Sequence, residues 1–144
     1  MRLEFEIEGI AKLGKQLEQI ASAQVDGMGK ALIEAGFRIQ RHAKKSIASS
    51  PIDPDTGRST PGNPPHTDTG LLAASIYVNT QEDNGRTVSV IVGTDVKYGQ
   101  WLEFGTKNIA PRPWLLPAFE ATKQKNMDAI KRAVVRVIKD KGAA

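Results

Sequence analysis

The chain has 144 residues, of which 40% are hydrophobic and 25% charged, with a formal net charge of +4 and no cysteine. This size and composition are typical of a single soluble domain with its own core. They exclude disulfides, thiolate metal sites and cysteine nucleophiles. No apolar run is long enough to suggest a membrane span, and the first ten residues do not resemble a secretory signal.

Charge is unevenly distributed along the chain. Residues 111–144 contain eight Lys or Arg and three Asp or Glu, which gives 8 − 3 = +5. Residues 49–70 contain one Arg and three Asp, which gives 1 − 3 = −2. The basic C-terminal region is compatible with contact to nucleic acid or to an acidic partner, and its charge does not choose between them.

The first third of the chain predicts a strand and two helices. Residues 2–8 alternate apolar residues with glutamates, which is the period of a strand with one buried face. Residues 10–20 carry apolar residues three and four apart, which predicts a short amphipathic helix. The same spacing predicts a longer helix over residues 25–46. Its expected buried stripe consists of Met28, Leu32, Ala35, Ile39, Ala43 and Ile47.

Residues 49–68 interrupt every regular pattern. They include five prolines and two glycines, which exclude a helix or an interior strand. A loop of this length inside a compact domain is usually functional or disordered. We expect an exposed, flexible arm that becomes ordered against a neighbouring molecule. The alternative is an insertion without a role.

The second half predicts a hairpin and a final helix. A helical turn over 69–76 leads into strands at 75–80 and 86–92, joined by a tight turn at 83–85. Residues 98–104 follow as a short extended or helical piece. Pro117 suits the first position of the last helix, which is expected to run to about Lys139. Its expected core stripe consists of Phe119, Met127, Ile130, Val134 and Val137.

These elements predict an α+β fold. A small, mostly antiparallel sheet packs against two long helices, and the long flexible loop at 49–68 projects from a single domain that covers residues 1–144.

The sequence gives little support to an enzyme. His42 and His66 lie in a basic helix and among prolines, without the spacing of metal ligands. The serines have no neighbouring base, and Glu103 is a lone carboxylate rather than half of an acid–base pair. No glycine-rich phosphate loop is present. We therefore expect no catalytic residue, metal, cofactor or small-molecule substrate.

Two kinds of surface contact remain as hypotheses. The basic residues Lys125, Arg132, Arg136 and Lys139 share one face of the final helix. Contacts from this face to phosphates would give salt-sensitive DNA binding without sequence preference, whereas the alternative is a simple solvated face.

Aromatic residues are concentrated between positions 101 and 119, which contain four of the eight in the chain. Core packing is one explanation. The alternative is a subunit interface anchored by a tryptophan and by Arg112, which stands between two prolines. The candidate interface residues are Trp101, Glu103, Phe104, Arg112 and Trp114.

The order of several short motifs resembles a known family. The motifs are Ala43-Lys44, Pro51, Thr69-Gly70-Leu71-Leu72, Ser75-Ile76, Tyr98, Glu103-Phe104-Gly105-Thr106, Pro111-Arg112-Pro113-Trp114 and Pro117-Ala118. Together they resemble the minor tail components, or tail-completion proteins, of long-tailed double-stranded DNA phages of the lambdoid type. The chain departs from that pattern in its longer loop after Pro51, and in Trp114, where phenylalanine is more familiar.

The resemblance implies a structural virion protein at the neck, made in the bacterial host cytoplasm and encoded by a phage or prophage. Such proteins complete the tail and help to join it to a DNA-filled head. The implied partners are further copies in a ring such as a hexamer, the head-side connector, and tail-terminator or tail-tube proteins. Non-specific contact with channel DNA is compatible with this place, and no membrane is involved. The alternative function is a sequence-nonspecific DNA-binding protein.

Overall fold

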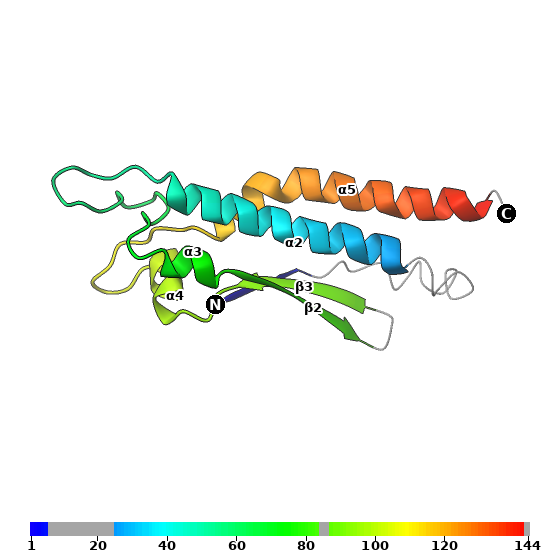
Figure 1. Cartoon of the computed structure of the whole chain (residues 1–144), viewed down its shortest axis with the longest axis horizontal. Helices are drawn as coiled ribbons and strands as arrows, with labels where there is room; N and C mark the ends of the chain where they lie inside the picture. The colour runs from blue at the N-terminus through cyan, green and yellow to red at the C-terminus, as the bar shows by residue number, and fades with distance from the viewer. Residues whose placement is uncertain (6–24, 84–86, 143–144) are drawn as a thin grey trace.

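The computed structural model describes residues 1–5, 25–83 and 87–142. Its elements in chain order are β1 (Arg2–Phe5), α2 (Val25–Ala48), α3 (Leu71–Ser75), β2 (Tyr77–Asp83), β3 (Thr87–Gly93), α4 (Lys97–Phe104) and α5 (Leu116–Gly142). The strands form one antiparallel sheet in the order β1-β3-β2. Figure 1 shows α2 and α5 side by side, with the sheet next to α2. The predicted α+β class is confirmed.

The predicted apolar stripe of α2 forms the centre of the core. Leu32, Ala35, Ile39, Ala43 and Ile47 are all buried, and Met28 is half-buried. These residues pack against the central strand β3, whose Val90 and Val92 are fully buried.

Gly36 sets how closely α2 approaches the sheet. A Cβ at this position would lie 2.6 Å from Cγ1 of Val90 and 2.9 Å from Cγ1 of Val78. Real Cβ contacts are not this short, so a side chain here would push the helix away from β2 and β3.

The hairpin forms as predicted, with somewhat different bounds. The strands pair without a break from Tyr77 opposite Gly93 to Asp83 opposite Thr87. Three predicted features lie outside the described residues: most of the turn at 83–85, the helix over 10–20 and the end of the strand over 2–8.

The burial pattern of α5 differs in one position from the core stripe predicted for it. Met127 is 42% exposed, so its assignment to the core was wrong. Phe119, Val134 and Val137 are half-buried. Among the residues of α5 whose side chains the structure describes, the buried ones are Ala118, Thr122, Asn126 and Ile130, spaced four apart.

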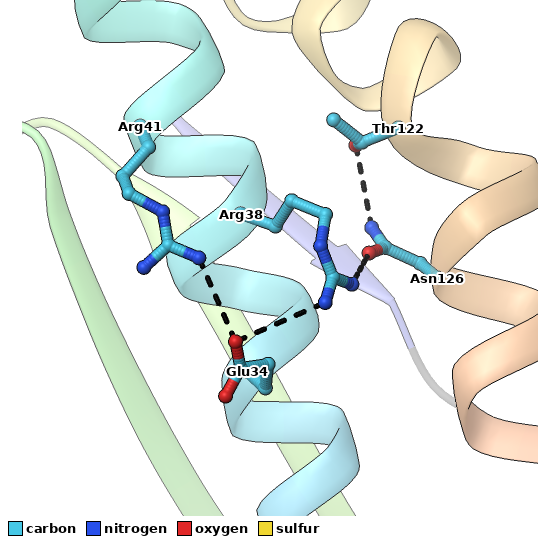
Figure 2. A network of polar contacts seen from close by, with 5 residues as sticks. All are labelled: Glu34, Arg38, Arg41, Thr122 and Asn126. Carbon is cyan, nitrogen blue, oxygen red and sulfur yellow. Dashed lines mark hydrogen bonds and ion pairs between the residues drawn. The ribbon is translucent and has the colours of Figure 1, made fainter.

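A polar network between the two long helices explains why α5 buries polar residues and leaves Met127 exposed (Figure 2). Arg38 of α2 donates a hydrogen bond to Oδ1 of Asn126 at 2.5 Å, and Nδ2 of Asn126 donates to Oγ1 of Thr122 at 3.3 Å. Glu34 lies 3.8 Å from the Arg38 guanidinium and 3.6 Å from that of Arg41. Because Arg38 supplies a donor, the buried side of α5 accommodates polar side chains that an apolar neighbour would exclude.

No helix in the described ranges is both long enough and apolar enough to cross a membrane.

Candidate assembly surface

Glu103 joins the end of α4 to the beginning of α5. It is buried, and its carboxylate accepts hydrogen bonds from three successive backbone N–H groups. Oε2 accepts from Trp114 at 2.7 Å and from Leu115 at 2.9 Å, and Oε1 accepts from Leu116 at 2.8 Å. The first N–H groups of a helix lack intrahelical partners, and the helix dipole favours a negative charge there. The carboxylate therefore caps α5 from a distant position in the chain.

The sequence before α5 explains why the cap is distant. Pro113-Trp114-Leu115 carries no hydroxyl, amide or carboxylate side chain that could accept these N–H groups. Pro117, the second residue of α5, has no N–H to satisfy. A buried helix start without a local cap requires an acceptor from elsewhere in the fold. This missing cap is the sequence signal from which the capping role of Glu103 could have been predicted.

Trp114 lies in the core. Its side chain is fully buried, and its indole Nε1–H donates a hydrogen bond to the carbonyl oxygen of Gly99 at 2.9 Å. A Cβ at Gly99 would lie 2.7 Å from Cγ2 of Thr94 and 3.1 Å from Cδ1 of Leu72. Position 99 therefore has room only for glycine, and sequence reasoning did not identify it.

A tight turn follows α4. Gly105 has φ 74°, in the left-handed region that favours glycine, and a Cβ there would lie 2.8 Å from the carbonyl oxygen of Ile109. Thr106 N–H donates to the Ile109 carbonyl at 2.8 Å, and Thr106 Oγ1 accepts from the Asn108 N–H at 3.2 Å. The Glu-Phe-Gly-Thr motif thus provides a cap, an exposed ring, a left-handed turn and a turn-closing hydroxyl, in that order.

Arg112 connects this turn to the loop at 49–68. Its Nε donates to the Ser59 carbonyl at 2.8 Å, and its backbone N–H donates to the Leu102 carbonyl at 2.6 Å. Gly62 N–H donates to the Pro111 carbonyl at 2.9 Å. Most residues of this loop are exposed, and Ser59 is one of its buried members. Figure 1 shows the loop projecting beyond one end of the helix pair.

A groove of about 930 Å³ lies between this loop and α4. Its apolar wall includes Ile52, Leu71, Leu102 and Ile109, and its cations are Arg58 and Arg112. Within the described residues, neither arginine forms an ion pair. The groove is open and its lining combines apolar side chains with charged ones, which suits a polypeptide better than a small substrate.

Trp101 and Phe104 lie on the opposite side of α4 from the buried residues. Trp101 is 49% exposed and Phe104 67% exposed, while Glu103 between them is buried. The five predicted interface residues therefore differ in exposure and do not all lie on one surface. Trp101 and Phe104 face solvent, Arg112 is half-buried against the loop, and Glu103 and Trp114 are inside the chain.

The four predicted DNA-contact residues all lie on α5. Lys125, Arg132, Arg136 and Lys139 are exposed. None of them forms an ion pair with a described residue. Their exposure is compatible with either the DNA-binding or the solvated-face interpretation.

The described part of the chain brings together no group of three His, Cys, Asp or Glu side chains that could hold a metal ion. His42 Nδ1 lies 3.3 Å from the Ser46 hydroxyl, and His66 Nδ1 lies 3.1 Å from the Ser50 carbonyl oxygen. Both histidines therefore have local structural partners.

Comparison with protein families matches residues 11–105 to the HK97-gp10_like family, described as "Bacteriophage HK97-gp10, putative tail-component". Comparisons with curated proteins and with solved structures find no match. The family match covers α2, the hairpin and α4 with its Glu-Phe-Gly segment, all of which precede the residues that Glu103 caps. The chain therefore belongs to the HK97 gp10-like family of bacteriophage tail components.

Proposed function

We propose that this protein completes the phage tail at the neck and helps to join it to the DNA-filled head, as a ring of identical subunits. As a tail component it is part of the virion, together with other phage structural proteins, and its family indicates a structural rather than an enzymatic role. The head-side connector and the tail-terminator or tail-tube proteins are the proposed neighbours in the neck.

One observation carries the proposal: α4 presents two large aromatic rings to solvent from a firmly held backbone. Trp101 and Phe104 are exposed, although the cap from Glu103 and the bond between Trp114 and Gly99 fix the same short helix. Exposed aromatic rings on a fixed backbone are typical of interface anchors, because burying them costs little conformational entropy. Glu103 and Trp114 then support this surface from inside the chain, and Arg112 supports its rim.

The test is electron microscopy of lysates from a phage with an early stop codon in this gene. We expect filled heads beside separate, full-length tails. Joined particles of normal appearance would contradict the proposal. Heads without any tails would instead place the protein in tail construction.

The alternative function uses four exposed cations of α5, Lys125, Arg132, Arg136 and Lys139, which form no ion pair with a described residue. On this proposal the helix binds duplex DNA through phosphates, with affinity that falls steeply as salt rises. Gel-shift measurements at several salt concentrations test it, with Arg132→Ala combined with Arg136→Ala as the variant. DNA binding that is absent, or unchanged in the variant, would exclude this function.

A further inference from the structure

We propose that residues 49–71 of one copy, the loop at 49–68 and the start of α3, dock on the outer face of α5 of a second copy, so that subunits associate head to tail. This inference rests on the proposed ring and specifies the contact that would form it. We call residues 49–71 the arm. The outer face of α5 is the stripe formed by Met127, Lys131, Val135 and Ile138, together with the neighbouring cations Arg132 and Lys139.

The outer face of α5 combines exposed apolar side chains with cations. Met127, Val135 and Ile138 are each more than 40% exposed, although they are large apolar residues. Spacings of four, four and three place them with Lys131 along one side of the helix. Arg132 and Lys139 lie three before and four after Val135, so they flank it. None of these cations forms an ion pair with a described residue.

The arm carries exposed apolar and acidic side chains, which complement the apolar and basic outer face of α5. Ile52 and Leu71 are large apolar residues about half-exposed, and Asp55 and Asp68 are exposed nearby in the chain. Neither aspartate forms an ion pair with a described residue. Residues 49–70 carry a net charge of −2, against +5 for residues 111–144.

The two surfaces cannot meet within one molecule. Figure 1 shows the arm projecting beyond one end of the helix pair, while α5 ends at the opposite end. A contact between different surfaces of identical subunits is heterologous, and it closes into a ring when the rotation between neighbours divides a full turn. Apolar burial would supply most of the affinity, and the charges would orient the two surfaces.

The absence of native cysteine allows a direct test by disulfide crosslinking in assembled particles. Ile52→Cys combined with Val135→Cys is expected to give a ladder of covalent multimers after oxidation. The matched control is Ile52→Cys with Phe37→Cys, because Phe37 is 43% exposed on α2, close to the 48% of Val135, and lies outside both surfaces.

Each crosslinking result either supports or contradicts the proposed contact between the arm and α5. A ladder specific to the pair at 52 and 135 supports the inference. Joined particles without a ladder, or with an equal ladder in the control, would overturn it and leave the proposed function standing. Absence of the protein from joined particles would overturn both.

Charge exchange gives an independent test that separates this contact from DNA binding. Asp55→Lys with Asp68→Lys, or Arg132→Glu with Lys139→Glu, is expected to lower the yield of joined particles about tenfold, since the loss is repeated at every contact of the ring. Combining all four changes should restore the yield, because the charges again oppose one another. A combined variant no better than either pair would contradict the inference. Lys107→Glu, at an exposed position outside both the arm and the outer face of α5, is the control and should not lower the yield.

Discussion

The two sides of α4 contrast sharply. On its inner side Gly99 and Glu103 are buried, and both bind the segment that begins α5. On its outer side Trp101 and Phe104 are exposed. Eight residues thus hold the chain together on one side and present aromatic rings on the other. Neighbouring positions in one motif can therefore serve stability and assembly separately, and variants on the two sides should separate these effects.

The largest expected effect on the inner side comes from Trp114→Ala. Removing a fully buried indole leaves a cavity and an unpaired Gly99 carbonyl. We expect the free energy of unfolding to fall by about 3–5 kcal/mol, measured by urea denaturation. A loss below about 1 kcal/mol would contradict the core assignment of Trp114.

Glu103→Ala should be nearly as severe. It leaves three N–H groups at the start of α5 without their acceptor, with an expected loss of about 3–5 kcal/mol in urea denaturation. Glu103→Gln keeps one acceptor and removes the charge, so it should cost less, about 1–3 kcal/mol. Equal stability of the wild type and the Ala variant would exclude the capping role.

Gly99→Ala tests the close packing behind α4. The added methyl group would press on Thr94 and Leu72, and we expect a loss of about 1–3 kcal/mol. Gly29→Ala on α2 is the matched control, because a methyl group at that position would meet no neighbouring side chain within 4 Å. In thermal or urea unfolding the control should be neutral or slightly stabilising.

The smallest effect on stability is expected on the outer side. Trp101→Ala combined with Phe104→Ala should change the free energy of unfolding by less than about 1 kcal/mol, since both rings are exposed. The same variant should lose head–tail joining, scored by electron microscopy of complemented lysates. Normal joining with normal stability would remove these rings from the proposed interface. A large loss of stability would show that they support the fold instead.

Local patterns in the sequence predicted much of the fold. The apolar spacing of α2 identified its buried residues, and the valines of β3 indicated a strand of the hairpin. The short motifs indicated the family that the comparison confirmed. Such signals are readable because the periods of helices and strands depend on neighbouring residues only.

The candidate site was predicted less completely. Sequence reasoning grouped five residues as an interface without separating the exposed Trp101 and Phe104 from the buried Glu103 and Trp114. A period alone does not say which side of a short helix is covered. That depends on what packs against the helix, here Thr94, Leu72 and the start of α5.

The sequence by itself thus determined the α+β class, the main elements and the family. Only the tertiary structure decided which polar groups are buried. Arg38 lies 88 residues from its partner Asn126, and Glu103 caps backbone groups up to 13 residues away. The exposure of Met127 has the same origin, since α5 buries its polar Thr122 and Asn126 and Asn126 accepts a hydrogen bond from Arg38 of α2. A buried polar group is stable only beside its partner, and that partner is found by folding rather than by local pattern.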